Sequence, residues 1–172
     1  VLNDAPKNFE NWFVMINSPY NLNQNWDGQI QIQNSRGSLV RGNEVHVGDC
    51  TANAIVIIQQ NRMCKGCPNP GQMVVMNNLI EGNRITMDDC TSPRVGAVGD
   101  FHLNSFQNNS FSRNTYTLFA NNRTAQGIDW FWIGGPSPKE KRQMSGDTLS
   151  TFQKETSQGI GSRVINQHGK CC

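Results

Sequence analysis

The chain repeats a ten-residue segment after a spacing of forty residues. Residues 42–51 are GNEVHVGDCT and residues 82–91 are GNRITMDDCT, so Gly, Asn, Asp, Cys and Thr recur and two apolar positions are kept. The tripeptides GQI at 28–30 and GQM at 71–73 precede the two copies. A repeat period of about 20 to 50 residues is typical of solenoids, propellers and other arrays. We therefore expect a stack of similar units, with function on one face of the stack.

Length and composition indicate one β-rich domain. The chain has 172 residues, of which 16% are charged, below the usual quarter. Asn, Gln, Ser, Thr and Gly fill the deficit, and they disfavour helices and favour turns. We predict a single all-β domain over residues 1–172. Residues 1–27 form an N-terminal cap or first coil, residues 28–135 the repeat coils, and residues 136–172 a C-terminal cap with a Cys-Cys tail.

Short apolar runs recur along the chain with turn-forming residues between them. Several alternate apolar and polar residues, which is the period of a half-buried strand. Asn, Gly or Asp closely follows most of these runs. The predicted strands are 12–16, 30–33, 45–47, 54–58, 73–76, 85–87, 101–103, 116–119 and 130–133.

Strands this short, with Asn at the bends, favour a right-handed parallel β-helix of about five coils, counting two coils in each forty-residue repeat. Asn tolerates the left-handed backbone that a tight bend needs. Its side-chain amide can also bond to an Asn one coil away and form a ladder. Residues 76–87 and 101–116 both follow an order of strand, Asn bend, strand, bend, strand. The alternative is an antiparallel β-sandwich in which the repeat is a duplicated hairpin.

On these motifs the chain resembles right-handed parallel β-helix proteins of the pectin-lyase-like kind, over residues 28–165. The coil-like segment at 77–85 carries the resemblance, together with the Asn-x-Tyr strand at 114–116, the aromatic strand at 129–132 and the segment 149–156. The resemblance implies a short amphipathic segment after the last coil.

That segment is expected to be a capping helix. Ser145 or Asp147 would cap a helix over residues 148–155. Leu149 and Phe152 are three positions apart and would face the stack. A cover is needed because the open end of a solenoid exposes unpaired strand edges.

An even number of cysteines predicts disulfides and a secreted protein. Cys50 and Cys90 hold matching repeat positions, so they either stack within bonding distance or pair elsewhere. The adjacent terminal cysteines would reach different partners, for which the Cys-x-x-Cys pair is the obvious candidate. Zinc at that pair is an alternative that needs two more ligands. The six are Cys50, Cys64, Cys67, Cys90, Cys171 and Cys172.

Other sequence signals limit the partners. The formal net charge is only +2 and the basic residues are scattered, which is no footprint for nucleic acid. No run approaches the roughly 18 apolar residues of a membrane helix. Val1 begins no signal peptide, so a processed N-terminus or a longer precursor is expected. Asn108 and Asn122 begin glycosylation sequons, used if the source glycosylates.

The candidate catalytic residues point outward or lie at strand ends. β-Helix enzymes that act on acidic sugars carry carboxylates, a His and Arg or Lys on one outer face, so the resemblance implies a similar role here. Lyases of this kind remove a C5 proton while Ca²⁺ or Arg neutralises the uronate, and hydrolases use paired Asp. The comparable cluster contains Asp88, Asp89, Asp49, His46, Arg84, Asp100 and His102.

The same residues have a structural alternative. Asp49 and Asp89 hold matching repeat positions, and a repeated bend-forming role explains both. Glu44 and Arg84 also match, and would form an exposed pair between coils. Asp88 and Asp89 with bend carbonyls are candidates for Ca²⁺. No other cofactor is expected.

Tryptophan offers a second way to bind sugar. Trp130 and Trp132 alternate with Phe131, so the two rings would share one face of a strand. They would either cap the core or form a platform on which a sugar ring stacks.

Together these features predict a secreted carbohydrate-binding or polysaccharide-processing module. We expect binding rather than catalysis; if the chain is an enzyme, it is a polysaccharide lyase or glycoside hydrolase. The alternative is a non-enzymatic structural or adhesive subunit of an extracellular assembly, including a homo-oligomer. A clustered outer face of Asp, His and Arg would favour the first class, and exposed apolar ends or cysteines that link chains would favour the second.

Overall fold

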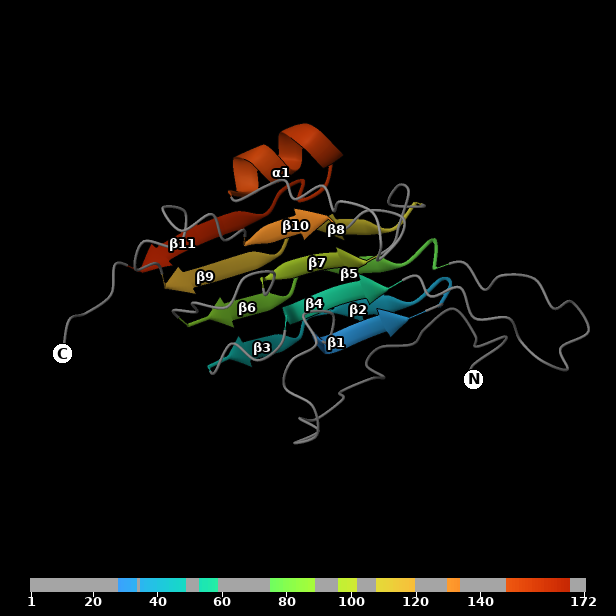
Figure 1. Ribbon diagram of the computed structural model, residues 1–172, viewed down its shortest axis with the longest axis horizontal. Helices are drawn as coiled ribbons and strands as arrows, with labels where there is room; N and C mark the ends of the chain where they lie inside the picture. The colour runs from blue at the N-terminus through green and yellow to red at the C-terminus, as the bar shows by residue number, and fades with distance from the viewer. Residues whose placement is uncertain are drawn as a thin grey trace, which may run out of the picture.

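The computed structural model describes eight segments of the chain (Figure 1). They are residues 28–33, 35–48, 53–58, 75–88, 96–101, 108–119, 130–133 and 148–167. These segments contain eleven strands and one helix. The elements are β1 (Gly28–Gln33), β2 (Leu39–Arg41), β3 (Glu44–Val47), β4 (Asn53–Ile58), β5 (Leu79–Glu81), β6 (Arg84–Met87), β7 (Val98–Phe101), β8 (Ser110–Ser112), β9 (Thr115–Phe119), β10 (Phe131–Ile133), α1 (Leu149–Thr156) and β11 (Arg163–Gln167).

The strands form three sheets, which we name after a central strand. The β4 sheet has the order β1-β4-β7-β10, the β6 sheet β11-β9-β6-β3, and the β5 sheet β2-β5-β8. Every strand pairing among the described residues is parallel. The prediction of an all-β fold is confirmed, and the antiparallel sandwich is excluded for these strands.

The chain visits the three sheets in a fixed order. It runs through the β5, β6 and β4 sheets as β2-β3-β4, then as β5-β6-β7, then as β8-β9-β10. We call each such traverse a pass. Within the described residues, β1 precedes the first pass, and an isolated bridge at Ile160 followed by β11 comes after the third. Figure 1 shows the strands of each sheet stacked in rows along the molecule.

The forty-residue repeat is one pass, and the expectation that it contains two coils is wrong. Glu44 in β3 lies directly beside Arg84 in β6, with no strand between them. Two coils in forty residues would require every connection between strands to be a tight bend. The connection from β6 to β7 instead occupies residues 88–97, so one pass consumes far more chain than its strands require.

The corner between the β5 sheet and the β6 sheet has a left-handed residue in every pass. Gly42, Gly82 and Gly161 have φ of 68°, 64° and 69°, and Arg113 has φ of 52° at the corresponding position. This conformation costs an L-residue about 1–2 kcal/mol, which explains glycine at three of the four corners.

An asparagine ladder follows these corners, as the sequence predicted. The Asn83 Oδ1 atom accepts from the backbone N–H of Asn43 at 3.0 Å and from its Nδ2 at 2.9 Å. One pass further, the Asn114 Oδ1 atom accepts from the backbone N–H and the Nδ2 of Asn83 at 2.9 and 3.0 Å. The Asn83 Nδ2 also donates to the Val40 carbonyl at 3.0 Å. The ladder therefore satisfies buried polar groups that the strand pairing leaves over.

A second ladder lies at the corner that leads into the β5 sheet. Asn77 and Asn108 adopt the left-handed conformation there, as predicted for Asn bends. The Asn109 Oδ1 atom accepts from the backbone N–H of Asn78 at 3.0 Å and from its Nδ2 at 2.7 Å. The Asn78 Oδ1 atom accepts from the backbone N–H of Ser38 at 2.8 Å. Asparagine side chains thus link two corners of each described pass to the matching corners of the next pass by hydrogen bonds.

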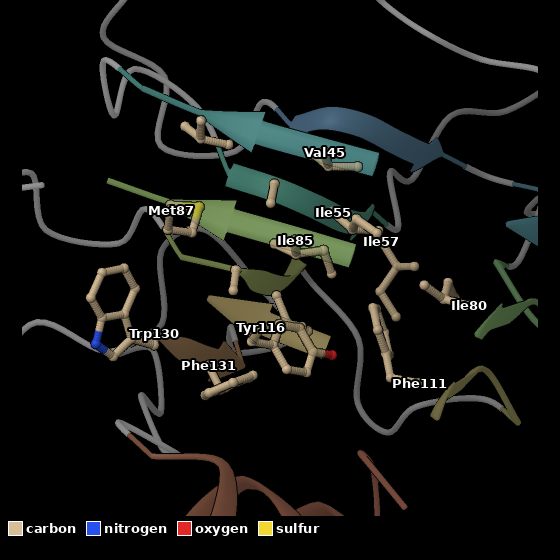
Figure 2. Close-up of a cluster of buried hydrophobic side chains, with 14 of the residues drawn as sticks. Val45, Ile55, Ile57, Ile80, Ile85, Met87, Phe111, Tyr116, Trp130 and Phe131 are labelled. Carbon is tan, nitrogen blue, oxygen red and sulfur yellow. The ribbon is translucent and has the colours of Figure 1, made fainter. Parts of the chain in front are cut away.

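One hydrophobic core lies between the three sheets. In β3 the residues alternate, with Val45 and Val47 buried and Glu44 and His46 exposed. Figure 2 shows buried side chains from all three sheets pointing toward one another. β4 differs from the other strands because all six of its residues are buried, as expected for a strand covered on both faces. The side chains labelled in Figure 2 are Val45, Ile55, Ile57, Ile80, Ile85, Met87, Phe111, Tyr116, Trp130 and Phe131.

Helix α1 covers one end of this core. Phe152 is fully buried, and its ring stacks on that of Phe131 with centroids 5.3 Å apart. Leu149 packs against the same core, so the prediction that both residues face the stack is confirmed. The N-cap is Thr148, whose side chain accepts from the Thr151 N–H. The prediction that Ser145 or Asp147 caps the helix is therefore wrong, because the helix begins at Leu149, one residue later than expected.

The predicted strands agree with the structure at most positions in the described segments. The run at 73–76 is an exception, because Met76 forms only an isolated bridge with Arg36. β7 ends where the predicted strand at 101–103 begins, and the run at 12–16 lies outside the described residues. The apolar runs singled out none of β2, β5, β8 and β11, although the coil-like segments 76–87 and 101–116 contain β5 and β8.

We predict that Asn83→Ala lowers the free energy of unfolding by about 3 kcal/mol, because it leaves several buried donors and acceptors without partners. Asn43→Ala, at the matching position of the preceding pass, should cost only about 1 kcal/mol. Its side chain makes one of these ladder bonds, as a donor to Asn83. Chemical denaturation of the two variants measures the difference. Equal losses would show that the ladder does not stabilise the fold in this way.

Candidate functional site

The outer face of the β6 sheet presents polar side chains in register across four strands. In β9, Tyr116 and Leu118 are buried, so Thr115 and Thr117 point outward. Parallel register places these residues in rows with outward residues of the neighbouring strands. We call this surface the polar face. Its residues are Glu44, His46, Arg84, Thr86, Thr115, Thr117, Phe119, Arg163 and Ile165.

The structure brings two of the predicted site residues together on this face. The His46 Nε2 atom lies 3.2 Å from the Asp88 Oδ2 atom. Asp88 follows the end of β6 and comes two residues after Thr86, so it emerges on the same side of the sheet. The His46 side chain is 64% exposed and the Asp88 side chain 41% exposed. The pair can therefore donate and accept hydrogen bonds to a ligand lying on the face.

Arg84 lies on the same face and pairs with Glu44, as expected. The Arg84 Nη1 atom is 4.0 Å from the Glu44 Oε1 atom, and both side chains are about four-fifths exposed. An exposed pair at this distance adds about 0–1 kcal/mol to stability. Its charges remain accessible to a ligand.

Of the remaining members of the predicted cluster, Asp100 is in a described segment and belongs to a different sheet. Asp100 is in β7, a strand of the β4 sheet, where it lies in register with Ile57 and Ile133. Asp49, Asp89 and His102 lie outside the described residues.

The prediction of Ca²⁺ at Asp88 and Asp89 stays a prediction, because Asp89 falls outside those residues. Across the segments that the structure describes, no three His, Cys, Asp or Glu side chains gather closely enough to hold a metal ion.

Trp130 does not offer the exposed ring that a sugar platform needs. It is 4% exposed and belongs to the hydrophobic core, which was the alternative role. The neighbouring Phe131 is also buried. Trp130 comes just before β10, so the strand alternation used in the prediction does not extend to it. Trp132 is part of β10, but its side chain is not among those described.

A buried carboxylate contacts two arginines, and it was not predicted from the sequence. The Glu81 side chain is 8% exposed, and its Oε1 atom lies 3.7 Å from the Arg41 Nε. Its Oε2 atom accepts from the Arg113 Nη2. The sequence does contain a signal for this contact. Arg41 and Glu81 hold matching positions directly before a left-handed Gly-Asn corner, and Arg113-Asn114 is a third copy of that corner.

Of the two predicted glycosylation sites, one lies within the described residues. Asn108 is exposed, and its Nδ2 donates to the Asn77 Oδ1 at 2.8 Å. Asn122 lies outside the described residues, as do all six cysteines, so the disulfides stay a prediction.

Tyr116 has a structural role. Its ring packs edge-on against Phe131 with centroids 4.9 Å apart, and its hydroxyl accepts from the Asn114 Nδ2 at 3.3 Å. Burial raises the pKa of the Tyr116 phenol above its ordinary value, and the hydrogen bonds with Asn114 and Ser162 offset this only in part. The phenol therefore stays neutral and links the ladder to the core.

Comparisons of this chain with protein-family models, curated proteins and solved structures found no match. Among the described helical residues, none form a helix long and apolar enough to cross a membrane.

We predict that Glu81→Gln lowers the free energy of unfolding at pH 7 by about 1–2 kcal/mol, since hydrogen bonds to charged groups contribute about 1.5–3 kcal/mol and Gln keeps part of them. Glu44→Gln is the matched control, because it breaks an exposed pair with Arg84. Its cost should stay within about 0.5 kcal/mol. Thermal or urea unfolding compares the two variants. A larger cost for Glu44→Gln would contradict this description of the Glu81 site.

Proposed function

We propose that the chain is a right-handed parallel β-helix module that binds carbohydrate outside the cell. The fixed order in which the chain visits three parallel sheets supports the β-helix. Right-handed crossovers are the general rule for parallel strands. The asparagine ladders and the α1 cap are further support. The six cysteines support the extracellular location.

The polar face is the observation that carries the binding function. It combines an imidazole, hydroxyls, guanidinium groups and carboxylates in rows set by the strand register. Neighbouring strands are about 4.8 Å apart, so the four strands of this sheet span about 14 Å. Sugar hydroxyls both donate and accept hydrogen bonds, and this mixture of side chains offers partners for both.

An aromatic ring lies in line with the His46–Asp88 pair. Phe119 is half-buried and outward-facing at the end of β9. Met87 is in register with Leu118, so Asp88 and Phe119 fall in the same row of the face. A sugar ring that bonds to the polar pair could therefore also stack on an apolar surface.

We propose binding without turnover for this face. Acid–base catalysts usually lie in enclosed sites that exclude water. The His46 and Asp88 side chains are instead 64% and 41% exposed on the outer face of a sheet. Such a pair suits reversible contact with hydroxyl groups.

A second candidate is a structural or adhesive subunit, and one observation favours it. Ile160 is 70% exposed and Ile165 is 42% exposed, and both lie on the last part of the stack. β11, which contains Ile165, is an edge strand of the β6 sheet. An edge strand with exposed apolar residues is a common site of protein association. A native mass well above 19.2 kDa would favour this function.

We predict that the double variant Asp88→Ala/Thr117→Ala binds polysaccharide about tenfold more weakly than the original chain. Loss of two hydrogen bonds of about 0.7 kcal/mol each, about 1.4 kcal/mol together, accounts for a change of this size. Affinity is measured against a panel of immobilised neutral and acidic polysaccharides.

The control is Glu155→Ala, an exposed carboxylate on α1 away from the polar face. It should leave affinity unchanged, and unfolding curves should show that both variants fold. Absence of binding to every polysaccharide in the panel would reject the carbohydrate function. Equal loss in the control would reject the polar face as the site.

A further inference from the structure

Four arginines follow one edge of the stack, at the corner between the β5 sheet and the β6 sheet. Arg41 ends β2, Arg84 begins β6, Arg113 occupies a left-handed corner and Arg163 begins β11. Arg41 lies just before β3 and Arg113 just before β9. Because β3, β6, β9 and β11 are successive neighbours in one sheet, each arginine comes from a different level of the stack. We call these four residues the arginine ridge.

The ridge is open to solvent. The side chains of Arg41, Arg84 and Arg113 are 60%, 79% and 66% exposed, and Arg163 is also exposed. Strands about 4.8 Å apart place the first and last arginines about 14 Å apart along the stack. The four arginines are therefore spread along the stack, with Arg84 and Arg163 in one row on the β6 sheet, Arg113 at the corner and Arg41 on the β5 sheet.

Each guanidinium group is held by a neighbour. Arg41 and Arg113 share the buried Glu81 carboxylate. The Arg163 Nε donates to the Thr115 Oγ1 at 3.2 Å, and Arg84 pairs with Glu44. Side chains that are already oriented lose less conformational entropy when a ligand binds.

The ridge keeps a net positive charge. Its four arginines are accompanied by Glu44 and Glu81, which leaves two positive charges, the same as the formal net charge of the whole chain. Glu81 is buried and already shared, so Glu44 is the exposed carboxylate within the ridge. An anionic ligand would meet guanidinium groups whose charges are only partly neutralised.

We propose that the arginine ridge binds the sulfate or carboxylate groups of an anionic polysaccharide that lies across the adjoining polar face. The proposal rests on the carbohydrate-binding function above and specifies the class of ligand. Guanidinium groups form paired hydrogen bonds to two oxygens of one oxyanion, which suits the planar carboxylate and the tetrahedral sulfate alike. The sugar hydroxyls of the same chain would meet Thr86, Thr117 and the Asp88 carboxylate.

The neighbouring residues favour a polysaccharide over a nucleic acid. Single-stranded nucleic acids need aromatic side chains on which successive bases stack. The described residues beside the ridge are Thr115, Ser112 and the corner asparagines and glycines. An anionic polysaccharide carries hydroxyls between its charged groups and can place them against the Glu44 and Asp88 carboxylates, whereas a nucleic acid carries a charged phosphate at every nucleotide.

Three polymers with the same backbone test the proposal on the full chain. They are neutral dextran, dextran sulfate and carboxymethyl dextran. We expect at least about tenfold tighter binding to one or both charged polymers than to dextran, weakening steeply with salt. The double variant Arg84→Gln/Arg163→Gln should lower the ratio of the affinity for the charged polymer to the affinity for neutral dextran about tenfold, because both residues lie on the polar face but only the charged polymer uses their positive charge. It leaves the buried Glu81 with both of its arginines.

The matched control is Arg36→Gln/Lys154→Gln, which removes two exposed positive charges outside the ridge. It should bind as the original chain does, and unfolding midpoints should show that all variants fold. Equal binding to dextran and the charged polymers would overturn the proposal and leave the carbohydrate function in place. Binding to no polysaccharide would overturn both. Equal losses in the control, or tighter binding to single-stranded DNA than to dextran sulfate, would overturn the ridge as an anionic-polysaccharide site.

Discussion

The hydrogen bonds of buried asparagine side chains at the corners set the arrangement of the described structure. Parallel strands satisfy their own backbone groups, but the chain leaves each short strand through a tight, left-handed corner. Asn78, Asn83, Asn109 and Asn114 are almost completely buried at these corners. An unpaired amide there would cost about 1–3 kcal/mol, so each carboxamide must find partners in the neighbouring pass. That requirement aligns one pass with the next.

This alignment also determines the outer surface. Because each corner lies directly over the one before it, residues at matching positions form rows across the β6 sheet. Glu44 beside Arg84 and His46 beside Thr86 are results of that register. The buried carboxylate of Glu81 between Arg41 and Arg113 has the same origin. The polar face and the arginine ridge are therefore consequences of the stacking that stabilises the fold.

Local requirements were the part of the fold that could be predicted. The Asn bends, the ladder and the inward-facing Phe152 follow from backbone conformation and apolar spacing, which a single sequence displays. The number of passes could not be predicted, because the repeat does not show how much chain each connection uses. β11 has little apolar alternation to distinguish it, and its pairing with β9 depends on the rest of the stack.

The candidate site was predictable only in part, for a similar reason. Alternation within β3 correctly placed His46 outward, and its contact with Asp88 joins two neighbouring passes. Alternation failed for Trp130, which precedes its strand and enters the core. Glu81 faces outward on a three-residue strand, which predicts an exposed side chain. Its burial arises from arginines that lie forty residues before it and thirty-two residues after it.

Hydrogen exchange of the asparagine side-chain amides, observed by NMR, tests the central claim most directly. In this account both Nδ2 protons of Asn83 are bonded, to the Val40 carbonyl and the Asn114 Oδ1, whereas the exposed Asn108 donates only to Asn77. We expect the Asn83 carboxamide to exchange at least about a hundredfold more slowly than that of Asn108, because exchange there requires the passes to separate. Similar rates for the two carboxamides would contradict the ladder as the interaction that aligns the stack.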